Sequence, residues 1–361
     1  MKMLTIEGEV LVKCDKNAEG IISIPDTVSI IGESAFFECL DIKVVIVPDS
    51  VTLIENHAFW GCKGLETVIL GDNVESIGQS AFEECVSLRS VHIPRSVKRI
   101  EDCAFQACDS LESICVDTSN NVFDSREGCN AIIETFHDTL VVACKSTAIP
   151  DTVTHIGENA FRTVTQVESV TIPSSVIKIG DYAFAECEAL KSLSIPASVR
   201  YIGCGITIHC NNLKAITVDH ANPIYDSREE CNGVVETATD TLIAGCNTTT
   251  LPDSLISIGN SAFSGFCFET LPLNDFIQDI GDYAFAFCCN LKEISLPSSV
   301  KKLGSSAFAR CINLTSAILP SVEDIRSFTF GATSLSEIAI PHNAQIHPTA
   351  MGCDVRIKNI I

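Results

Sequence analysis

The sequence predicts a β-rich solenoid of about twelve stacked coils, formed as a single domain over residues 1–361. The first observation behind this prediction is an Ala-Phe pair that recurs every 22 to 23 residues. Self-similarity at such a fixed period is typical of repeat architectures. The second is composition: 46% of the residues are hydrophobic but only 6% are aromatic. The third is that short apolar segments alternate with turn-forming residues, as expected of many short strands.

The repeat occupies twelve positions, two of which, Ile206-Thr207 and Ala350-Met351, are degraded copies. Two gaps of 56 residues interrupt the series, and each equals one 23-residue period plus an insertion of 33 residues. The other ten positions are Ala35-Phe36, Ala58-Phe59, Ala81-Phe82, Ala104-Phe105, Ala160-Phe161, Ala183-Phe184, Ala262-Phe263, Ala284-Phe285, Ala307-Phe308 and Thr329-Phe330.

Each repeat predicts two short extended segments. The pattern Leu-x-x-Ile-x-Ile, as in Leu88, Val91 and Ile93, places alternate apolar side chains on one face of a strand. The proline that follows, Pro94 in this repeat, has no N–H to donate and ends the strand. Val-x-x-Ile-Gly forms the second segment, and Ala-Phe begins the turn back. Because 23 residues cannot bury their own Phe and Ile, the units must stack, with strands ~4.8 Å apart.

The two ends of the chain are expected to cap the stack. Residues 1–25 are predicted to form an N-terminal hairpin, in which the segment 9–13 pairs with the segment 21–24. Residues 341–361 are predicted to form a C-terminal capping coil.

The full pattern, I-P-x-S-V-x-x-I-G-x-x-A-F-x-x-C-x-x-L-x-x-I-x-I, resembles the BspA-like class of leucine-rich repeat proteins from about Ile21 to Ile357. This resemblance implies a leucine-rich repeat solenoid with a parallel β-sheet on one face. It also implies a bacterial or protozoan protein that binds other proteins. Several members of the class lie at cell surfaces and adhere to host proteins, which implies a surface adhesin as an alternative function.

The two insertions, 117–150 and 219–252, are copies of one segment offset by 102 residues. Each is predicted to form an irregular turn followed by a β-hairpin, 132–135 with 139–143 and 234–237 with 241–245. Each also contains Asp-Ser-Arg-Glu, at residues 124–127 and 226–229. This motif fits either a carboxylate–Arg ligand site or a turn in which Asp caps backbone N–H groups and Arg pairs with an acid. The second interpretation is favoured.

Eight of the 19 cysteines share one position, three residues after the Phe of the pair. Since Val164, Phe266 and Thr333 fill that position elsewhere, it is a packing position, and buried reduced thiols are predicted. Stacked thiols ~4.8 Å apart do not meet the geometry of a disulfide. Bridges are most plausible between Cys129 and Cys144 and between Cys231 and Cys246. The eight are Cys39, Cys62, Cys85, Cys108, Cys187, Cys210, Cys288 and Cys311.

The net charge of −22 disfavours nucleic acid and anionic lipid surfaces as partners, because both are bound through Lys and Arg. No apolar run approaches the ~18 residues of a membrane span. The N-terminus lacks the apolar core of a signal peptide, so we expect a cytoplasmic, reducing location. The family resemblance implies the alternative of a cell-surface or secreted protein.

No catalytic motif is present, so a non-enzymatic protein without a cofactor is predicted. The nearest approach to a metal site is the group Cys204, His209 and Cys210. Zinc requires ligands that converge. The side chain of Cys210 is expected to point into the core and that of His209 in another direction, so no metal site is predicted.

Stacked variable positions form the binding surfaces of solenoids, and two rows are candidates. The outward position of the strand reads Ile46, Ile69 and His92 in successive coils. The position after Ala-Phe places Phe37 beside Trp60, the only tryptophan. Exposed aromatic side chains on neighbouring repeats are typical of an interface, but this pair could equally pack beneath the N-terminal hairpin. The predicted partner is a protein, with self-association through the N-terminal coils as one form.

Overall fold

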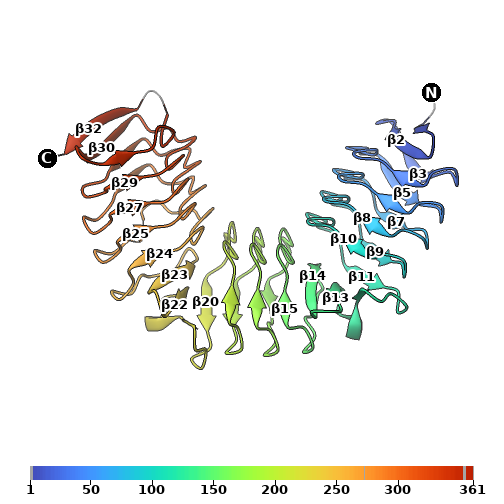
Figure 1. Ribbon diagram of the computed structural model, residues 1–361, viewed down its shortest axis with the longest axis horizontal. Coiled ribbons are helices and arrows are strands. Elements are labelled where there is room, and N and C mark those ends of the chain that lie inside the picture. The colour runs from blue at the N-terminus through green and yellow to red at the C-terminus, as the bar shows by residue number, and fades with distance from the viewer. Residues whose placement is uncertain (1–2, 272, 353–354, 361) are drawn as a thin grey trace. The chain divides into compact units, whose positions relative to one another are not determined.

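The computed structural model describes residues 3–271, 273–352 and 355–360. Nearly all their regular structure is β-strand, and the described helical segments are two short 3-10 turns, Arg126–Gly128 and Arg228–Glu230. No helix within these ranges is long and apolar enough to span a bilayer. The chain divides into two compact units, Met1–Val167 and Glu168–Ile361, and each is a stack of coils (Figure 1). The predicted solenoid is therefore confirmed.

In the first unit, each coil contributes one strand to each of two sheets. The first sheet has the order β1-β2-β4-β6-β8-β10. Its strands are β1 (Leu4–Glu7), β2 (Val10–Cys14), β4 (Ile30–Ile31), β6 (Leu53–Ile54), β8 (Ser76–Ile77) and β10 (Arg99–Ile100). The second sheet has the order β11-β9-β7-β5-β3 and is parallel. Its strands are β3 (Gly20–Ser23), β5 (Ile42–Ile46), β7 (Thr67–Ile69), β9 (Ser90–Ile93) and β11 (Ser113–Val116).

The first insertion forms an antiparallel group that leads back into the coils. The strands are β12 (Phe123–Asp124), β13 (Ala131–Glu134), β14 (Thr139–Ala143) and β15 (His155–Ile156). Strand β13 pairs antiparallel with both β12 and β14, while β14 pairs parallel with β15 of the next coil. The predicted hairpin is therefore confirmed, and its second strand starts the next ladder.

The second unit repeats this plan. One ladder has the order β16-β18-β20, and β17 pairs with β19. These strands are β16 (Ser169–Val170), β17 (Lys178–Ile179), β18 (Ser192–Ile195), β19 (Tyr201–Ile202) and β20 (Ala215–Val218). The second insertion forms β21 (Tyr225–Asp226), β22 (Val234–Glu236) and β23 (Thr241–Ala244), with β22 and β23 as the predicted hairpin.

From β23 the chain continues as two ladders to its C-terminal end. One has the order β21-β22-β23-β24-β25-β27-β29-β31 and the other β26-β28-β30-β32. The new strands are β24 (Ser257–Ile258), β25 (Asp279–Ile280), β26 (Glu293–Ser295), β27 (Lys302–Leu303), β28 (Ser316–Ile318), β29 (Asp324–Ile325), β30 (Glu337–Pro341), β31 (Gln345–Ile346) and β32 (Arg356–Ile360). Strand β32 pairs with β30, as expected of a final coil; residues 353, 354 and 361 of that coil lie outside the described part.

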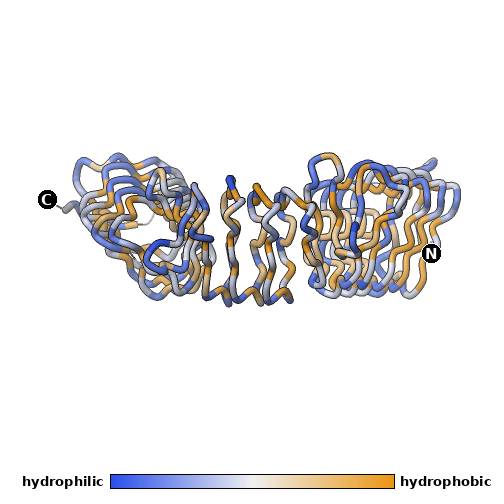
Figure 2. The backbone as a smooth tube through the Cα atoms, turned by 90° about the horizontal axis from the view of Figure 1, so that it is seen from below, coloured by the Kyte–Doolittle hydropathy of each residue, from blue (hydrophilic) through white to orange (hydrophobic). Residues whose placement is uncertain are grey.

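The core of each unit is a stack of the repeated phenylalanines. Phe36 and Phe59 are fully buried, and their ring centroids lie 4.6 Å apart. The stack continues to Phe82 and Phe105 with nearly parallel rings. Hydrophobic segments recur at the same place in successive coils, as Figure 2 shows. Each ring therefore packs against the rings of the coils before and after it, because successive coils are one strand spacing apart.

Hydrogen bonds between coils also tie the turns together. The N–H groups of Ser34, Phe36 and Glu38 donate to carbonyl oxygens of the next coil at 3.1, 2.7 and 2.8 Å. Donors two residues apart reach acceptors two residues apart, as in a sheet. The alternate N–H groups, of Ala35, Phe37 and Cys39, donate to carbonyls within the same turn, so each turn satisfies half of these donors itself and half through its neighbour.

This turn uses the left-handed region of backbone space twice in each coil. Ser34 has φ 55° and Glu38 has φ 53°, and equivalent residues in other coils behave alike. The position of Glu38 is a glycine in some coils, such as Gly61 with φ 68°. An L-residue pays roughly 1–2 kcal/mol in this region, so each coil holds backbone strain that the packing outweighs.

The predicted N-terminal hairpin is wrong in its pairing. Strand β2 pairs with β1 through the two-residue turn Gly8-Glu9, where Gly8 has φ 62°, a turn that hairpins favour. Strand β3, which contains most of the predicted partner, pairs parallel with β5 instead. Its Ile22 and the following Ile24 are buried in the same alternation as a coil strand, so this segment belongs to the first coil.

Replacing Ala332 with glycine is expected to stabilise the protein. Ala332 is exposed and has φ 54°, so glycine removes the left-handed penalty without removing a buried contact. The expected gain is about 1 kcal/mol in the free energy of unfolding, measured by urea denaturation. Ala309, in the preceding coil, lacks a positive φ and is the matched control, since Ala309→Gly should destabilise. Equal effects of the two changes would contradict the strain argument.

Candidate binding surfaces

The outer face of the sheet β3–β11 carries a row of exposed aliphatic side chains. Ile46 lies opposite Ile69 in the parallel register, and they are 37% and 50% exposed. Ile21, on the neighbouring strand β3, is 67% exposed. His92 and Cys115 follow on β9 and β11, opposite one another and exposed. We call Ile21, Ile46 and Ile69 the aliphatic patch. The predicted row of Ile46, Ile69 and His92 does therefore face solvent.

Phe37 and Trp60 lie side by side, as the spacing predicts. Their rings are stacked with centroids 4.9 Å apart and an interplanar angle of 16°. Phe37 is 37% exposed and Trp60 is half-buried. The Lys16 ammonium lies 5.4 Å from the Phe37 centroid and 3.2 Å from the Glu38 carboxylate. The residue after the N-terminal hairpin therefore contacts the pair, while a binding role for it stays a prediction.

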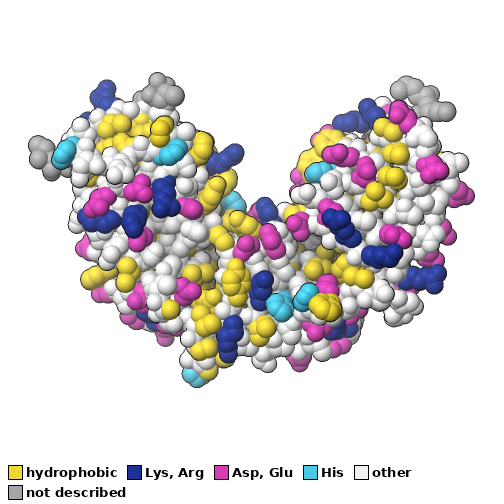
Figure 3. Space-filling model, in the orientation of Figure 1, with side chains coloured by type: hydrophobic (Ala, Val, Ile, Leu, Met, Phe, Trp, Pro, Cys, Tyr) yellow, Lys and Arg dark blue, Asp and Glu magenta, His cyan; other side chains and the backbone are white. Residues whose placement is uncertain are grey.

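Charged side chains near these rows pair from one coil to the next. Lys43 lies 3.4 Å from Glu66, and Lys98 lies 3.0 Å from Glu75. Acidic and basic side chains are accordingly interspersed on the face seen in Figure 3. All four are well exposed, so each pair contributes at most ~1 kcal/mol to stability.

The Asp-Ser-Arg-Glu segments are structural turns, as favoured from the sequence. Arg126 donates to Asp124 and, at 2.6 Å, to Asp138 of the hairpin β13–β14. Arg228 makes the same contacts with Asp226 and Asp240, at 2.7 Å for the latter. The hydrogen bonds that the two guanidinium groups donate to the paired carboxylates raise the pKa of both arginines. Each arginine thus fixes its hairpin to the turn before it.

The cysteines at the shared position, three residues after the Phe, donate their thiol hydrogens to backbone carbonyls of the preceding coil. The Sγ atoms of Cys62 and Cys85 lie 3.0 and 3.3 Å from the carbonyl oxygens of Phe36 and Phe59. Burial raises the pKa of the Cys62 thiol well above its ordinary value. Cys108, at the end of the first array, is half-buried, whereas most of the others are fully buried. A thiol thus acts here as a small apolar group with one weak donor.

The two cysteine pairs of the hairpins are separate thiols. Cys129 donates to the carbonyl of Ala131, and Cys144 to that of Asn130 at 3.3 Å. Cys231 and Cys246 are likewise unbridged and buried.

Cys204, His209 and Cys210 do not converge. Cys210 donates to Phe184 at 3.0 Å, Cys204 contacts the carbonyl of Asn260, and the His209 ring packs edge-on against Phe287. No group of three metal-ligating side chains is found within the described ranges.

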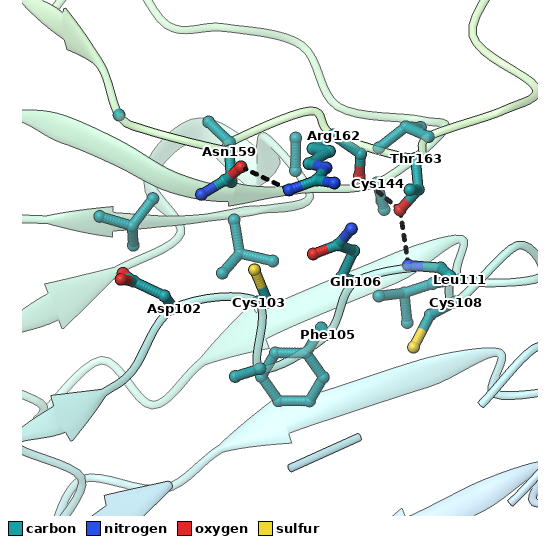
Figure 4. A pocket seen from close by; sticks show the side chains of 18 of the residues that line it. Asp102, Cys103, Phe105, Gln106, Cys108, Leu111, Cys144, Asn159, Arg162 and Thr163 are labelled. Carbon is teal, nitrogen blue, oxygen red and sulfur yellow. Dashed lines mark hydrogen bonds between the residues drawn. The ribbon is translucent and has the colours of Figure 1, made fainter. Parts of the chain in front are cut away.

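Sequence reasoning missed a cavity of about 230 Å³ in the first unit, where the insertion meets the coils (Figure 4). The turn that contains Cys103 and Gln106 forms one wall, and the turn that contains Asn159 and Arg162 forms the other. Strand β14 lies at its base. The only sequence signal for it is the 56-residue gap, which shows that the two turns are not neighbours in an unbroken series.

Replacing two cysteines of this shared position with valine is expected to make the stability of the protein fall less at alkaline pH. Burial raises the pKa of Cys210 and of Cys311 to about 12, above that of an unfolded thiol. Their contribution to stability is therefore full below about pH 9 and is lost as the pH rises toward 12. In Cys210→Val/Cys311→Val the urea midpoint should fall less between about pH 8 and pH 11 than in the wild type. Cys267→Ser, at an exposed thiol, is the control and should fall like the wild type.

The family model for the BspA type leucine-rich repeat region matches in six copies, over residues 5–129, 134–228 and 243–351. Among solved structures, a leucine-rich cell surface protein from Faecalibacterium prausnitzii is 23% identical with a TM-score of 0.53. That alignment covers 100% of this chain and 96% of the other. A leucine-rich repeat protein from Eubacterium ventriosum is 21% identical with a TM-score of 0.48, covering 91% and 81%. No curated protein sequence matches significantly.

The breaks between the matched ranges lie at the two insertion hairpins, so the family pattern and the coils coincide. The similarity to the Faecalibacterium structure supports the same fold. The chain belongs to the BspA-type leucine-rich repeat family.

Proposed function

We propose that this protein is a non-enzymatic scaffold that binds another protein through the outer face of the sheet β3–β11. The aliphatic patch carries the proposal. Ile46 and Ile69 are held in register by backbone pairing and remain exposed, although large β-branched side chains are usually buried. Contiguous apolar surface on a rigid sheet is typical of protein interaction sites.

A counterpart in the second unit shows what is particular to the patch. Ile318 of β28 holds the equivalent strand position and is 47% exposed. Its neighbours in register are Ser295 and Ala339, so it stands alone. Isolated exposed aliphatic residues are common on soluble proteins, whereas Ile46 and Ile69 are exposed directly opposite one another, with Ile21 on the next strand. Ile318 is therefore a control of matched type, position and exposure.

The test is photo-crosslinking in cells of the source organism, with a photoreactive residue replacing Thr67 beside Ile69 or Ser316 beside Ile318. A protein partner should be captured from position 67 and not from position 316. Ile46→Ser/Ile69→Ser should reduce that capture at least tenfold, while Ile318→Ser leaves it unchanged. Because the substituted side chains are exposed, the melting temperature should stay the same in all variants.

Trp60→Ala separates the two candidate surfaces in the same experiment. If the aromatic pair were the docking site, this change, and not the change at Ile46 and Ile69, would abolish the capture. Equal capture from positions 67 and 316, or capture that survives Ile46→Ser/Ile69→Ser, would contradict the proposal.

The alternative function is a cell-surface adhesin that binds host matrix proteins. It is favoured by the description of the Faecalibacterium protein as a cell surface protein. Labelling of intact cells with an impermeant amine reagent, followed by binding to immobilised fibronectin and collagen, separates the two functions. The adhesin requires labelling and matrix binding. The scaffold proposal expects neither, in keeping with the unbridged hairpin thiols, which suit a reducing compartment.

A further inference from the structure

The hydrogen-bonded ladder of turns opens where the first insertion enters the stack. One coil earlier the ladder is intact: Ser80, Phe82 and Glu84 donate to carbonyls of the next turn at 3.0, 2.8 and 3.0 Å. In that next turn the corresponding donors are the N–H groups of Cys103 and Phe105. Neither has a hydrogen-bond partner among residues 3–271, 273–352 and 355–360.

The cause is the hairpin strand β14. In an unbroken series the Phe N–H donates to the Ala carbonyl of the following pair, as Phe36 does to Ala58. Here the following pair begins with Ala160, and its carbonyl already accepts from Ala143 of β14 at 2.9 Å. Ala107, the third donor of the turn, bonds the hydroxyl of Thr163 instead, at 2.6 Å. The two turns are thus hydrogen-bonded at Ala107 and Thr163, and no hydrogen bond joins them at Cys103 and Phe105.

The space between them is the cavity of about 230 Å³, which we call the junction slot. In Figure 4 the Cys103 thiol and the Gln106 amide point from one wall toward Asn159 and Arg162 on the other. The Gln106 amide makes no hydrogen bond within the described residues. An unsatisfied buried N–H costs roughly 1–3 kcal/mol, so an acceptor from outside the fold, a water or a ligand, stabilises these donors.

The spacing of the donors specifies the acceptor. In an unbroken series these N–H groups, two residues apart, donate to carbonyl groups two residues apart on the next turn, so the slot suits a chain that presents carbonyls at that spacing. The slot has the volume of about eight waters, at ~30 Å³ each, and is partly open, so two to three peptide residues enter it.

The charged side chains that line the slot indicate the charge of the peptide. Four carboxylates line the slot, from Glu101, Asp102, Asp109 and Glu158, against the two basic side chains Arg162 and Lys145. The whole chain carries −22, so its field attracts cations to the slot. We propose that the junction slot binds a short, positively charged peptide. This site lies in different residues from the aliphatic patch, and the proposal does not rest on the function proposed above.

The second junction supplies the control. Its turn has Ile208 and His209 where the first has Gln106 and Ala107. The His209 ring packs so closely on Gly265 that a Cβ there would lie 2.3 Å from its Nδ1 atom. The His209 N–H also donates directly to the carbonyl of Ser264 at 3.3 Å. The N–H groups of Gly205 and Thr207 have no partner within the described residues either, so the two junctions differ in the side chains of Ile208 and His209.

Isothermal titration of the full chain with trialanine amide, a +1 peptide, tests the proposal. The wild type should bind saturably, and Gln106→Ile/Ala107→His should bind at least tenfold more weakly. His209 has φ 55° and Ala107 has φ 54°, so the exchange respects the backbone, and an unchanged melting temperature verifies folding. N-acetyl-trialanine, a −1 peptide, should bind the wild type at least tenfold more weakly.

Alkylation of Cys103 locates the site, because bound trialanine amide should slow its reaction with iodoacetamide at least threefold. Ile208→Gln at the second junction should leave the affinity unchanged. No saturable heat at about 10 mM peptide would show that water alone satisfies the slot and would overturn the proposal. So would equal affinity of Gln106→Ile/Ala107→His, or equal affinity for the two peptides.

Discussion

The structure depends on hydrogen bonds that run from the turn of one coil to the turn of the next. The Ala-Phe turn has a regular pattern of donors, seen in Ser34, Phe36 and Glu38, which the turn of the next coil accepts. A coil on its own would leave these donors without partners and its phenylalanine exposed. Sequence repetition is therefore a physical requirement, because each coil is both the acceptor of one neighbour and the donor to the other.

This requirement explains features that look unfavourable in a single coil. Two left-handed residues per turn, such as Tyr283 and Phe287, are tolerated because the ladder fixes the backbone on both sides. Cysteine suits the inner turn position because its thiol reaches the carbonyl of the preceding phenylalanine, as from Cys311 to Phe285 at 3.2 Å. Ion pairs such as Lys43–Glu66 likewise join one coil to the next.

Much of the fold follows from the sequence because its period is regular. The strands, the buried phenylalanines, both insertion hairpins and the stacking of Phe37 on Trp60 all depend on spacing alone. The pairing of the N-terminal hairpin does not, since the alternating segments Leu4–Glu7 and Gly20–Ser23 both fit beside β2. The junction slot could not be predicted from the sequence either. It arises because two N–H groups, of Phe105 and Ala143, compete for the carbonyl of Ala160. Only the three-dimensional path of β14 decides that competition.

The three hairpins also affect how the chain reaches its fold. Each ends in a strand, β2, β14 or β23, that pairs directly with the first short strand of a coil series, β4, β15 or β24. A hairpin closes locally, within microseconds in general, and presents a ready edge for the coil that follows. Folding can accordingly nucleate at three places and propagate by contacts about 23 residues apart, which gives this all-β chain a lower contact order than its length would suggest.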